Sequence, residues 1–233
     1  MKLMNTTGSN TKIMKSQNGT EYRIASLSLW PDKLTCPGSP LADCMDDCLK
    51  IAGRGCMANV MQSRQSKTEL WHDDRELFLE LLRQELYAFE RSCQRQGKLP
   101  MVRLNTISDI PYEKHGIPQE FPGITMYDYT KLSARLGRTP ENYKLLFSYS
   151  AEPKYQKSVN MALDTGCPVA VVFRGGFPER FLDRPVINGD KSDIVNFTAG
   201  RVVVGLKLKG PKRVQQSTSK FIVNNPDLER LAA

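Results

Sequence analysis

Four of the six cysteines lie within residues 36–56, at positions Cys36, Cys44, Cys48 and Cys56. Thiolates that converge in this way bind a soft metal ion or an iron–sulfur cluster. Zinc sites more often contain paired CxxC motifs, and no pair here is so close, so the spacing favours a [4Fe-4S] cluster over zinc. A disulfide-bonded arrangement ranks below both, because a cytosolic compartment keeps thiols reduced.

The chain is expected to act in the cytoplasm, without a membrane partner. No apolar run at the N-terminus resembles a signal peptide, and no stretch of about 18 apolar residues could span a bilayer. The formal charge of +8 suits a phosphate-bearing partner, such as a nucleotide or a nucleic acid. However, the basic residues are spread through the chain, which is more typical of a solvated surface.

The elements that must position the cysteines are a strand and a helix. Residues 22–29 alternate enough to form a first strand, and Cys36 opens a Cys-Pro-Gly turn shortly after it. From Leu41 the pattern predicts a helix that places Cys44 and Cys48 four residues apart on one face. Both side chains could then bind the same ion or cluster.

Short apolar segments predict a largely parallel sheet covered on both faces, because several show little internal alternation and are joined by helical stretches such as residues 155–163. We expect an α/β fold with a complete or partial (β/α) TIM-like barrel, or an open doubly wound sheet as the alternative. Residues 21–233 would form this single domain, after a polar N-terminal arm over residues 1–20. The predicted strands cover residues 22–29, 101–104, 124–127, 145–147, 169–173, 186–187 and 202–206.

The clearest predicted helix, which Thr68 or Ser66 can cap, repeats apolar residues at spacings of three and four from Phe78 to Cys93 and ends at Gly97. Cys93 lies on this apolar stripe, so we expect it to be a small buried hydrophobic residue instead of a ligand.

Polar side chains follow three of the predicted strands. In a parallel barrel the carboxyl ends of the strands share one mouth, onto which the cysteine loop would also open. We therefore predict a cofactor or substrate pocket there, although each residue alone could equally be a helix cap or a turn former. The predicted pocket residues are Arg103, Asn105, Asp109, Asp128, Lys131 and Ser148.

Other catalytic patterns are poor. His72 and His115 are the only histidines and lie in contexts typical of surface or capping residues, so a histidine-dependent triad is not expected. No Walker loop or GxGxxG motif occurs. The sequence alone leaves open whether the protein is an enzyme.

An ordered series of segments between about residues 23 and 223 resembles the gene product 88 family of tailed-phage proteins. The resemblance implies a phage-encoded protein in the host cytoplasm, and it brings no secure biochemical function with it. The cysteine arrangement is also similar to that of radical S-adenosylmethionine barrels. The segments are CPGS, CLKIAGRG, KTELW, VRLNTISDIPYE, MYDYTK, NYKLLFSYS, PVAVVF, VINGDKSD and VVVGLKLKG.

Radical S-adenosylmethionine enzymes carry a CxxxCxxC loop, of which Cys44 and Cys48 reproduce only the first half, because Ile51 stands at the next position. Cys36 could supply the third thiolate and leave one iron open for S-adenosylmethionine. Alternatively, Cys56 could close the cluster, which would exclude that cofactor. Since Gly53 and Gly55 interrupt the predicted helix, Cys56 is the least secure ligand.

The sequence is therefore compatible with three functions. The first is an iron–sulfur protein that is redox-active or acts as a radical-type enzyme on a nucleotide or nucleic acid. The second is a zinc-stabilised phage protein that binds nucleic acid without catalysis. The third is a noncatalytic phage factor that binds a host protein.

Overall fold

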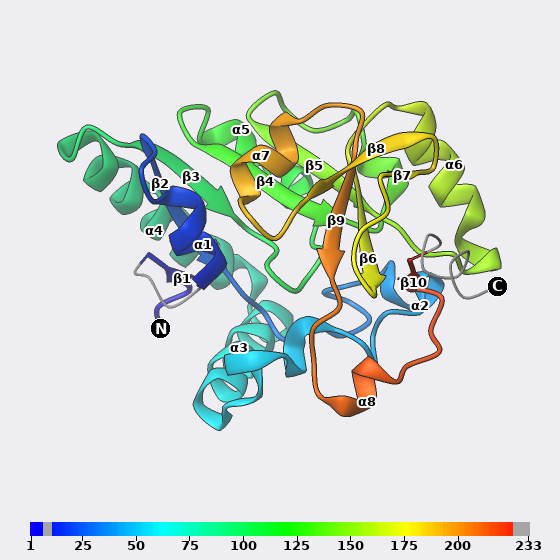
Figure 1. Cartoon of the computed structure of the whole chain (residues 1–233). Coiled ribbons are helices and arrows are strands. Elements are labelled where there is room, and N and C mark those ends of the chain that lie inside the picture. Colours follow the sequence, from blue (N-terminus) through cyan, green and yellow to red (C-terminus); the bar gives the residue numbers. More distant parts are fainter. Residues whose placement is uncertain (7–10, 226–233) are drawn as a thin grey trace, which may run out of the picture.

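The computed structural model describes residues 1–6 and 11–225, which form an α/β fold around a large, mostly parallel sheet (Figure 1). Within this part of the chain, no helix is both long and apolar enough to cross a membrane. The strands are β1 (Met4–Asn5), β2 (Tyr22–Leu27), β3 (Leu99–Arg103), β4 (Thr125–Thr130), β5 (Tyr143–Ser148), β6 (Val169–Arg174), β7 (Arg180–Phe181), β8 (Arg184–Asn188), β9 (Val203–Lys207) and β10 (Ile222–Asn224).

The α-helices cover the sheet and connect its parallel strands. They are α1 (Thr11–Gln17), α2 (Ser39–Ala42), α3 (Ala58–Asp73), α4 (Arg75–Arg95), α5 (Ile117–Glu120), α6 (Gln156–Asp164), α7 (Asp193–Thr198) and α8 (Lys212–Gln215). Short 3-10 helices are η1 (Leu49–Ile51), η2 (Gly53–Cys56), η3 (Tyr112–His115), η4 (Ser133–Arg135) and η5 (Pro153–Tyr155).

The strand order is β1-β2-β3-β4-β5-β6-β9-β8-β7, and β10 also pairs with β6. The pairings from β2 to β8 are parallel, whereas β1 and β7 pair antiparallel with their neighbours. Among the described strands, the two ends of this order do not pair, so the sheet is open. The mostly parallel α/β sheet is confirmed, and the expectation of a complete TIM-like barrel is wrong. Both edges end in antiparallel strands of two residues, which offer almost no backbone for closure.

Strand β10 extends the sheet beyond the end of β5. Strand β5 pairs with the start of β6, where Ser148 lies opposite Ala170, and β10 pairs with its end, where Ile222 lies opposite Val172. The C-terminal strand thereby reaches the carboxyl edge of the sheet. Figure 1 shows α2, α3 and α8 gathered beyond the arrowheads of β6 and β9 at this edge.

The predicted helix over Phe78–Cys93 is confirmed as α4, whose apolar stripe is buried in the core. The expected cap at Thr68 or Ser66 is wrong, because both residues lie inside α3. Asp74 is the N-cap of α4, and its carboxylate accepts a hydrogen bond from the amide of Leu77 at 2.9 Å. Helix α3 was not predicted, because only Thr68 and Trp71 on it are buried and its apolar residues form no stripe.

The predicted helix through Cys44 and Cys48 is wrong. Helix α2 is only four residues long and ends at Asp43, which adopts the left-handed conformation with φ 52°. A residue in this conformation cannot continue a right-handed helix. Cys44 and Cys48 therefore lie in an irregular segment and share no helix face.

The described part of the N-terminal segment packs on the sheet. Strand β1 pairs with β2, and the amides of Leu3 and Met4 donate to the carboxylate of Glu85 at 2.6 and 2.7 Å. Ile13 of α1 is buried against Met101 on β3. The composition of this segment is polar, but Leu3, Met4 and Ile13 are buried in the core.

Candidate functional site

A pocket of about 180 Å³ lies at the carboxyl edge of the sheet. One wall is the cysteine loop that follows β2, and the others come from the ends of β3, β4, β5 and β9 and from β10. Residues after separate strands meet here because parallel strands place their carboxyl ends at one edge.

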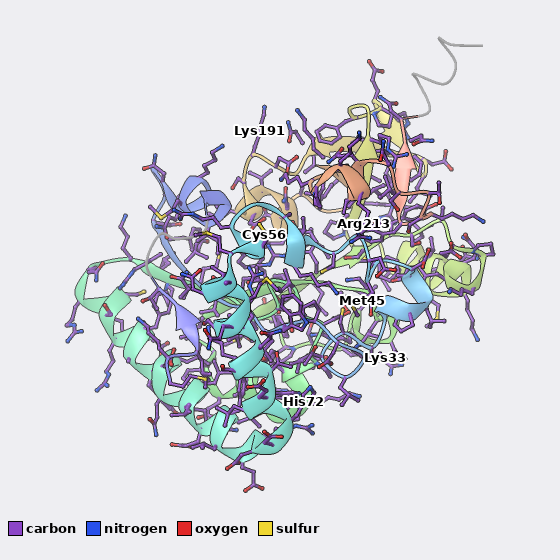
Figure 2. All side chains as sticks on the ribbon, turned by 90° about the horizontal axis from the view of Figure 1, so that it is seen from below. Lys33, Met45, Cys56, His72, Lys191 and Arg213 are labelled. Carbon is purple, nitrogen blue, oxygen red and sulfur yellow. The ribbon has the colours of Figure 1, made fainter. Side chains whose placement is uncertain are left out.

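Three of the four clustered cysteines line this pocket: Cys36, Cys44 and Cys48. Cys36 and Cys44 are almost fully buried, and Cys48 is half-buried. Cys56 does not line the pocket; it is exposed, and its thiol donates to the carbonyl oxygen of Gly53 at 2.9 Å. Figure 2 looks onto this side of the molecule and shows Cys56 well apart from Met45, which lies on the pocket wall between Cys44 and Cys48.

Cys36 and Cys44 lie close enough to the other pocket thiols for their ionisation to be affected. Burial raises the pKa of Cys44 to about 11; the Lys131 ammonium opposes this shift, and Cys36 and Cys48 add to it. Burial likewise raises the pKa of Cys36. The thiols of Cys36 and Cys44 are therefore protonated at neutral pH, and a metal or cluster would have to displace their protons. The described residues contain no group of three or more His, Cys, Asp or Glu side chains positioned to hold a metal ion.

Lys131 and Ser148 lie side by side at the ends of β4 and β5. The register pairs Thr130 of β4 with Phe147 of β5. Lys131 and Ser148 directly follow these two residues on neighbouring parallel strands, and both line the pocket. The hydroxyl of Tyr155 is 2.8 Å from the carbonyl oxygen of Lys131 and 3.1 Å from that of Ser148, which ties the two strand ends together.

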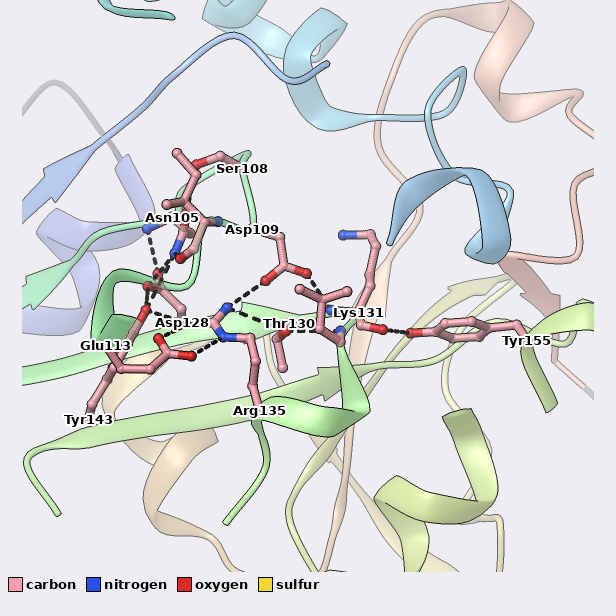
Figure 3. Close-up of polar contacts among 12 residues, drawn as sticks. Asn105, Ser108, Asp109, Glu113, Asp128, Thr130, Lys131, Arg135, Tyr143 and Tyr155 are labelled. Carbon is pink, nitrogen blue, oxygen red and sulfur yellow. Dashed lines mark hydrogen bonds and ion pairs between the residues drawn. The ribbon is translucent and has the colours of Figure 1, made fainter. Parts of the chain in front are cut away.

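The Lys131 side chain points away from the ion pairs behind it and toward α2 (Figure 3). Burial alone would lower the pKa of Lys131, but Cys44, Cys36 and Asp109 outweigh burial and raise it. Lys131 is therefore positively charged at neutral pH and lies beside two of the pocket thiols.

Arg103 also lines the pocket, but its guanidinium is engaged in contacts with other residues of the chain. Its Nη1 lies 3.4 Å from Asp193, its Nη2 donates to the carbonyl oxygen of Thr106 at 3.3 Å, and the guanidinium stacks over the Tyr129 ring at 4.6 Å. Its Nε is buried without a hydrogen-bond partner among the described residues.

Asn105 reaches the pocket wall, although its amide group is committed to the loop after β3. Its Nδ2 donates to Asp128 and to the carbonyl oxygen of Ile110, both at 3.0 Å. Its Oδ1 accepts from Ser108 at 2.9 Å and from the amide of Ile110 at 2.8 Å. These contacts shape the loop and leave little hydrogen-bonding capacity for a ligand.

Asp109 and Asp128 lie behind the pocket and do not line it (Figure 3). Asp109 forms an ion pair with Arg135 at 2.6 Å. Asp128 accepts hydrogen bonds from the backbone amide of Asn105 and from the Tyr143 hydroxyl, both at 2.6 Å. Burial raises the pKa of Asp128 to about 6, although these hydrogen bonds oppose the shift. Both carboxylates support the residues that face the cavity.

Sequence reasoning missed the wall formed by the C-terminal segment, to which Phe221 and Ile222 belong. This segment crosses the cysteine loop, since the Ser217 hydroxyl donates to Asp47 at 2.7 Å and the Ser219 hydroxyl donates to the carbonyl oxygen of Asp43 at 2.6 Å. The first pair is separated by 170 residues along the chain, so no local pattern could reveal it.

The family model described as Gene product 88 matches residues 2–225 of the 233-residue chain. No curated protein and no solved structure matched the chain. Nothing in these comparisons supports the likeness to radical S-adenosylmethionine barrels, whereas the family match covers nearly the whole sequence. The chain therefore belongs to the gene product 88 family of phage proteins.

Proposed function

We propose that this phage protein binds a [4Fe-4S] cluster through Cys36, Cys44 and Cys48, and that it does so in the host cytoplasm. The observation that supports the proposal best is that these three thiols line one pocket at the carboxyl edge of the sheet. Thiolates are the protein ligands of such clusters.

The proposed cluster has three protein ligands, because Cys56 lies outside the pocket wall and its thiol is hydrogen-bonded to Gly53. One iron would then face the rest of the pocket. When bound, a cluster of this kind supplies electron transfer and offers the open iron to a small molecule, of which S-adenosylmethionine is one candidate.

The residues around the thiols suit such a group. Lys131 supplies a positive charge that favours the thiolate forms of Cys36 and Cys44 and would balance the charge of the cluster. The apolar walls at Val172, Leu206 and Ile222 restrict water around it. Low solvent exposure and nearby charge both set the reduction potential of an iron–sulfur cluster.

The scaffold is consistent with a partial barrel. From β2 to β6 the strand order follows the chain order, and the pocket occupies the carboxyl edge, where barrel proteins hold their ligands. On this basis a redox role, or radical chemistry on a nucleotide or nucleic acid, is the activity that we propose.

The test is to purify the full chain under anaerobic conditions and to record its visible absorbance, its metal content and its electron paramagnetic resonance spectrum after reduction. A brown protein with a reducible iron–sulfur signal is the expected result. A colourless protein with zinc as its metal, and with binding to nucleic acid that falls steeply with salt, would instead establish the zinc-stabilised alternative.

A further inference from the structure

Lys131 and Ser148 both present a polar group to the pocket without a partner. The described hydrogen bonds of Lys131 involve its backbone amide and carbonyl, and those of Ser148 involve its carbonyl oxygen. The ammonium and the hydroxyl therefore form no hydrogen bond within residues 1–6 and 11–225. Ser148 is buried and Lys131 is half-buried, so water or a ligand in the pocket is the partner left for both groups.

The backbones that carry these two groups are fixed. Asp109 accepts from the Lys131 amide at 2.6 Å, and Tyr155 bridges the carbonyl oxygens of Lys131 and Ser148. The two side chains consequently start from neighbouring, rigid strand ends on one pocket wall. Donors held in place in this way bind an anion without first having to be ordered.

Two of the other cations that line the pocket are paired, and the third, Lys207, is exposed at its rim. Arg103 is paired with Asp193, and Lys209 forms an ion pair with Asp190. Lys131 forms no ion pair with the described part of the chain. Its charge lies beside the thiols of Cys36 and Cys44, where an incoming anion would meet it.

Part of the pocket wall is apolar. Phe221 and Ile222 come from the C-terminal segment, and Val172 and Leu206 come from β6 and β9. Such walls suit the apolar or aromatic part of a small molecule, whereas the donors suit its charged end.

We propose that Lys131 and Ser148 bind the carboxylate or phosphate group of a small molecule whose apolar part lies against Phe221 and Ile222. The inference deepens the proposed function and rests on it, because this ligand would lie beside the cluster thiols. Lys131 would supply charge, and the Ser148 hydroxyl would donate a hydrogen bond to an anionic oxygen.

Three probes separate the parts of this proposal: phenyl phosphate, benzoate and inorganic phosphate. Their dissociation constants are measured by calorimetry on the full chain, as purified under anaerobic conditions. We expect phenyl phosphate or benzoate to bind more tightly than inorganic phosphate, because only these two contact the apolar wall. The tighter of the two identifies the anionic group. Absence of binding by both phenyl phosphate and benzoate would overturn the proposal.

Lys131→Met should weaken the binding of the preferred probe by about tenfold or more, and Ser148→Ala should weaken it several-fold. Lys144→Met is the matched control, because Lys144 lies exposed on β5 and its loss should leave binding unchanged. Circular dichroism checks that each variant folds. If Lys131→Met does not fold, Ser148→Ala decides the outcome, and wild-type affinity in the folded variants would overturn the assignment.

Iron and sulfide are measured on the same samples. If the probe binds through Lys131 and Ser148 but the protein contains no iron, the anion site stands and the cluster proposal fails. If the cluster is present and neither organic probe binds, the anion site fails and the cluster proposal stands.

Discussion

The carboxylate of Asp109 accepts a hydrogen bond from the backbone amide of Lys131 at 2.6 Å. Its other oxygen forms the ion pair with Arg135, and its own amide donates to the carbonyl oxygen of Thr35 at 2.7 Å, next to Cys36. Asp109 thereby joins the cysteine loop to the end of β4. The position of the cation relative to the thiols depends on this one buried carboxylate.

Asp109→Ala should lower the free energy of unfolding by about 3–5 kcal/mol, because it leaves the buried guanidinium of Arg135 with one partner fewer. Urea unfolding of the two proteins measures the difference. Asp164→Ala, at an exposed position near the end of α6, serves as the control and should change stability by less than about 0.5 kcal/mol. Equal small effects of both substitutions would show that Asp109 does not hold this edge together.

Gly38→Ala should disrupt the packing of the cysteine loop against Lys131 at the end of β4. A Cβ added at Gly38 would lie 2.6 Å from the Cβ of Lys131, which is closer than two carbon atoms can approach. We expect a loss of about 1–3 kcal/mol in stability and reduced cluster content. Gly123→Ala is the matched control, because its added methyl group meets only the end of the flexible Glu90 side chain. A fully loaded, fully stable Gly38→Ala protein would contradict the close packing.

Cys48→Ala and Cys56→Ala should differ in cluster content. Cys48 lines the pocket and Cys56 does not, so the first variant should lose most of its iron and the second should retain it. Cys167→Ala is a control outside the cluster of four. Iron loss in Cys56→Ala as large as that in Cys48→Ala would support a cluster closed by four thiolates.

Asp128 should give stability a specific pH dependence. Its pKa is raised from 3.8 to about 6, so the folded protein keeps a proton that the unfolded chain releases between these values. The free energy of unfolding should fall as the pH rises through this window, by an amount on the order of 3 kcal/mol, and level off above it. Asp128→Asn should remove this component. The difference between the two pH profiles from chemical denaturation measures it, and parallel profiles would refute the shifted pKa.

The fold and much of the pocket could be predicted because their signals are local. Apolar runs mark the parallel strands, and polar residues such as Arg103, Lys131 and Ser148 stand where those strands end. Parallel pairing then brings the ends together without further information.

The remaining features depend on contacts that no local pattern contains. The predicted helix through Cys44 does not form, because Asp43 takes the left-handed conformation and ends α2 before Cys44. Asp109 and Asp128 lie after or near the end of a strand, as the pocket residues do. However, Asp109 pairs with Arg135 and Asp128 accepts from Tyr143, and both carboxylates lie behind the pocket wall. Apolar periodicity also gave no sign that the sheet would end in very short antiparallel strands.

The most direct test of the proposed cluster is the iron and acid-labile sulfide content of the anaerobically purified wild-type chain, measured beside the triple variant Cys36→Ala, Cys44→Ala and Cys48→Ala. We expect about four iron and four sulfide atoms per wild-type chain and almost none in the variant. A wild-type chain without sulfide, or a variant with undiminished iron, would contradict it.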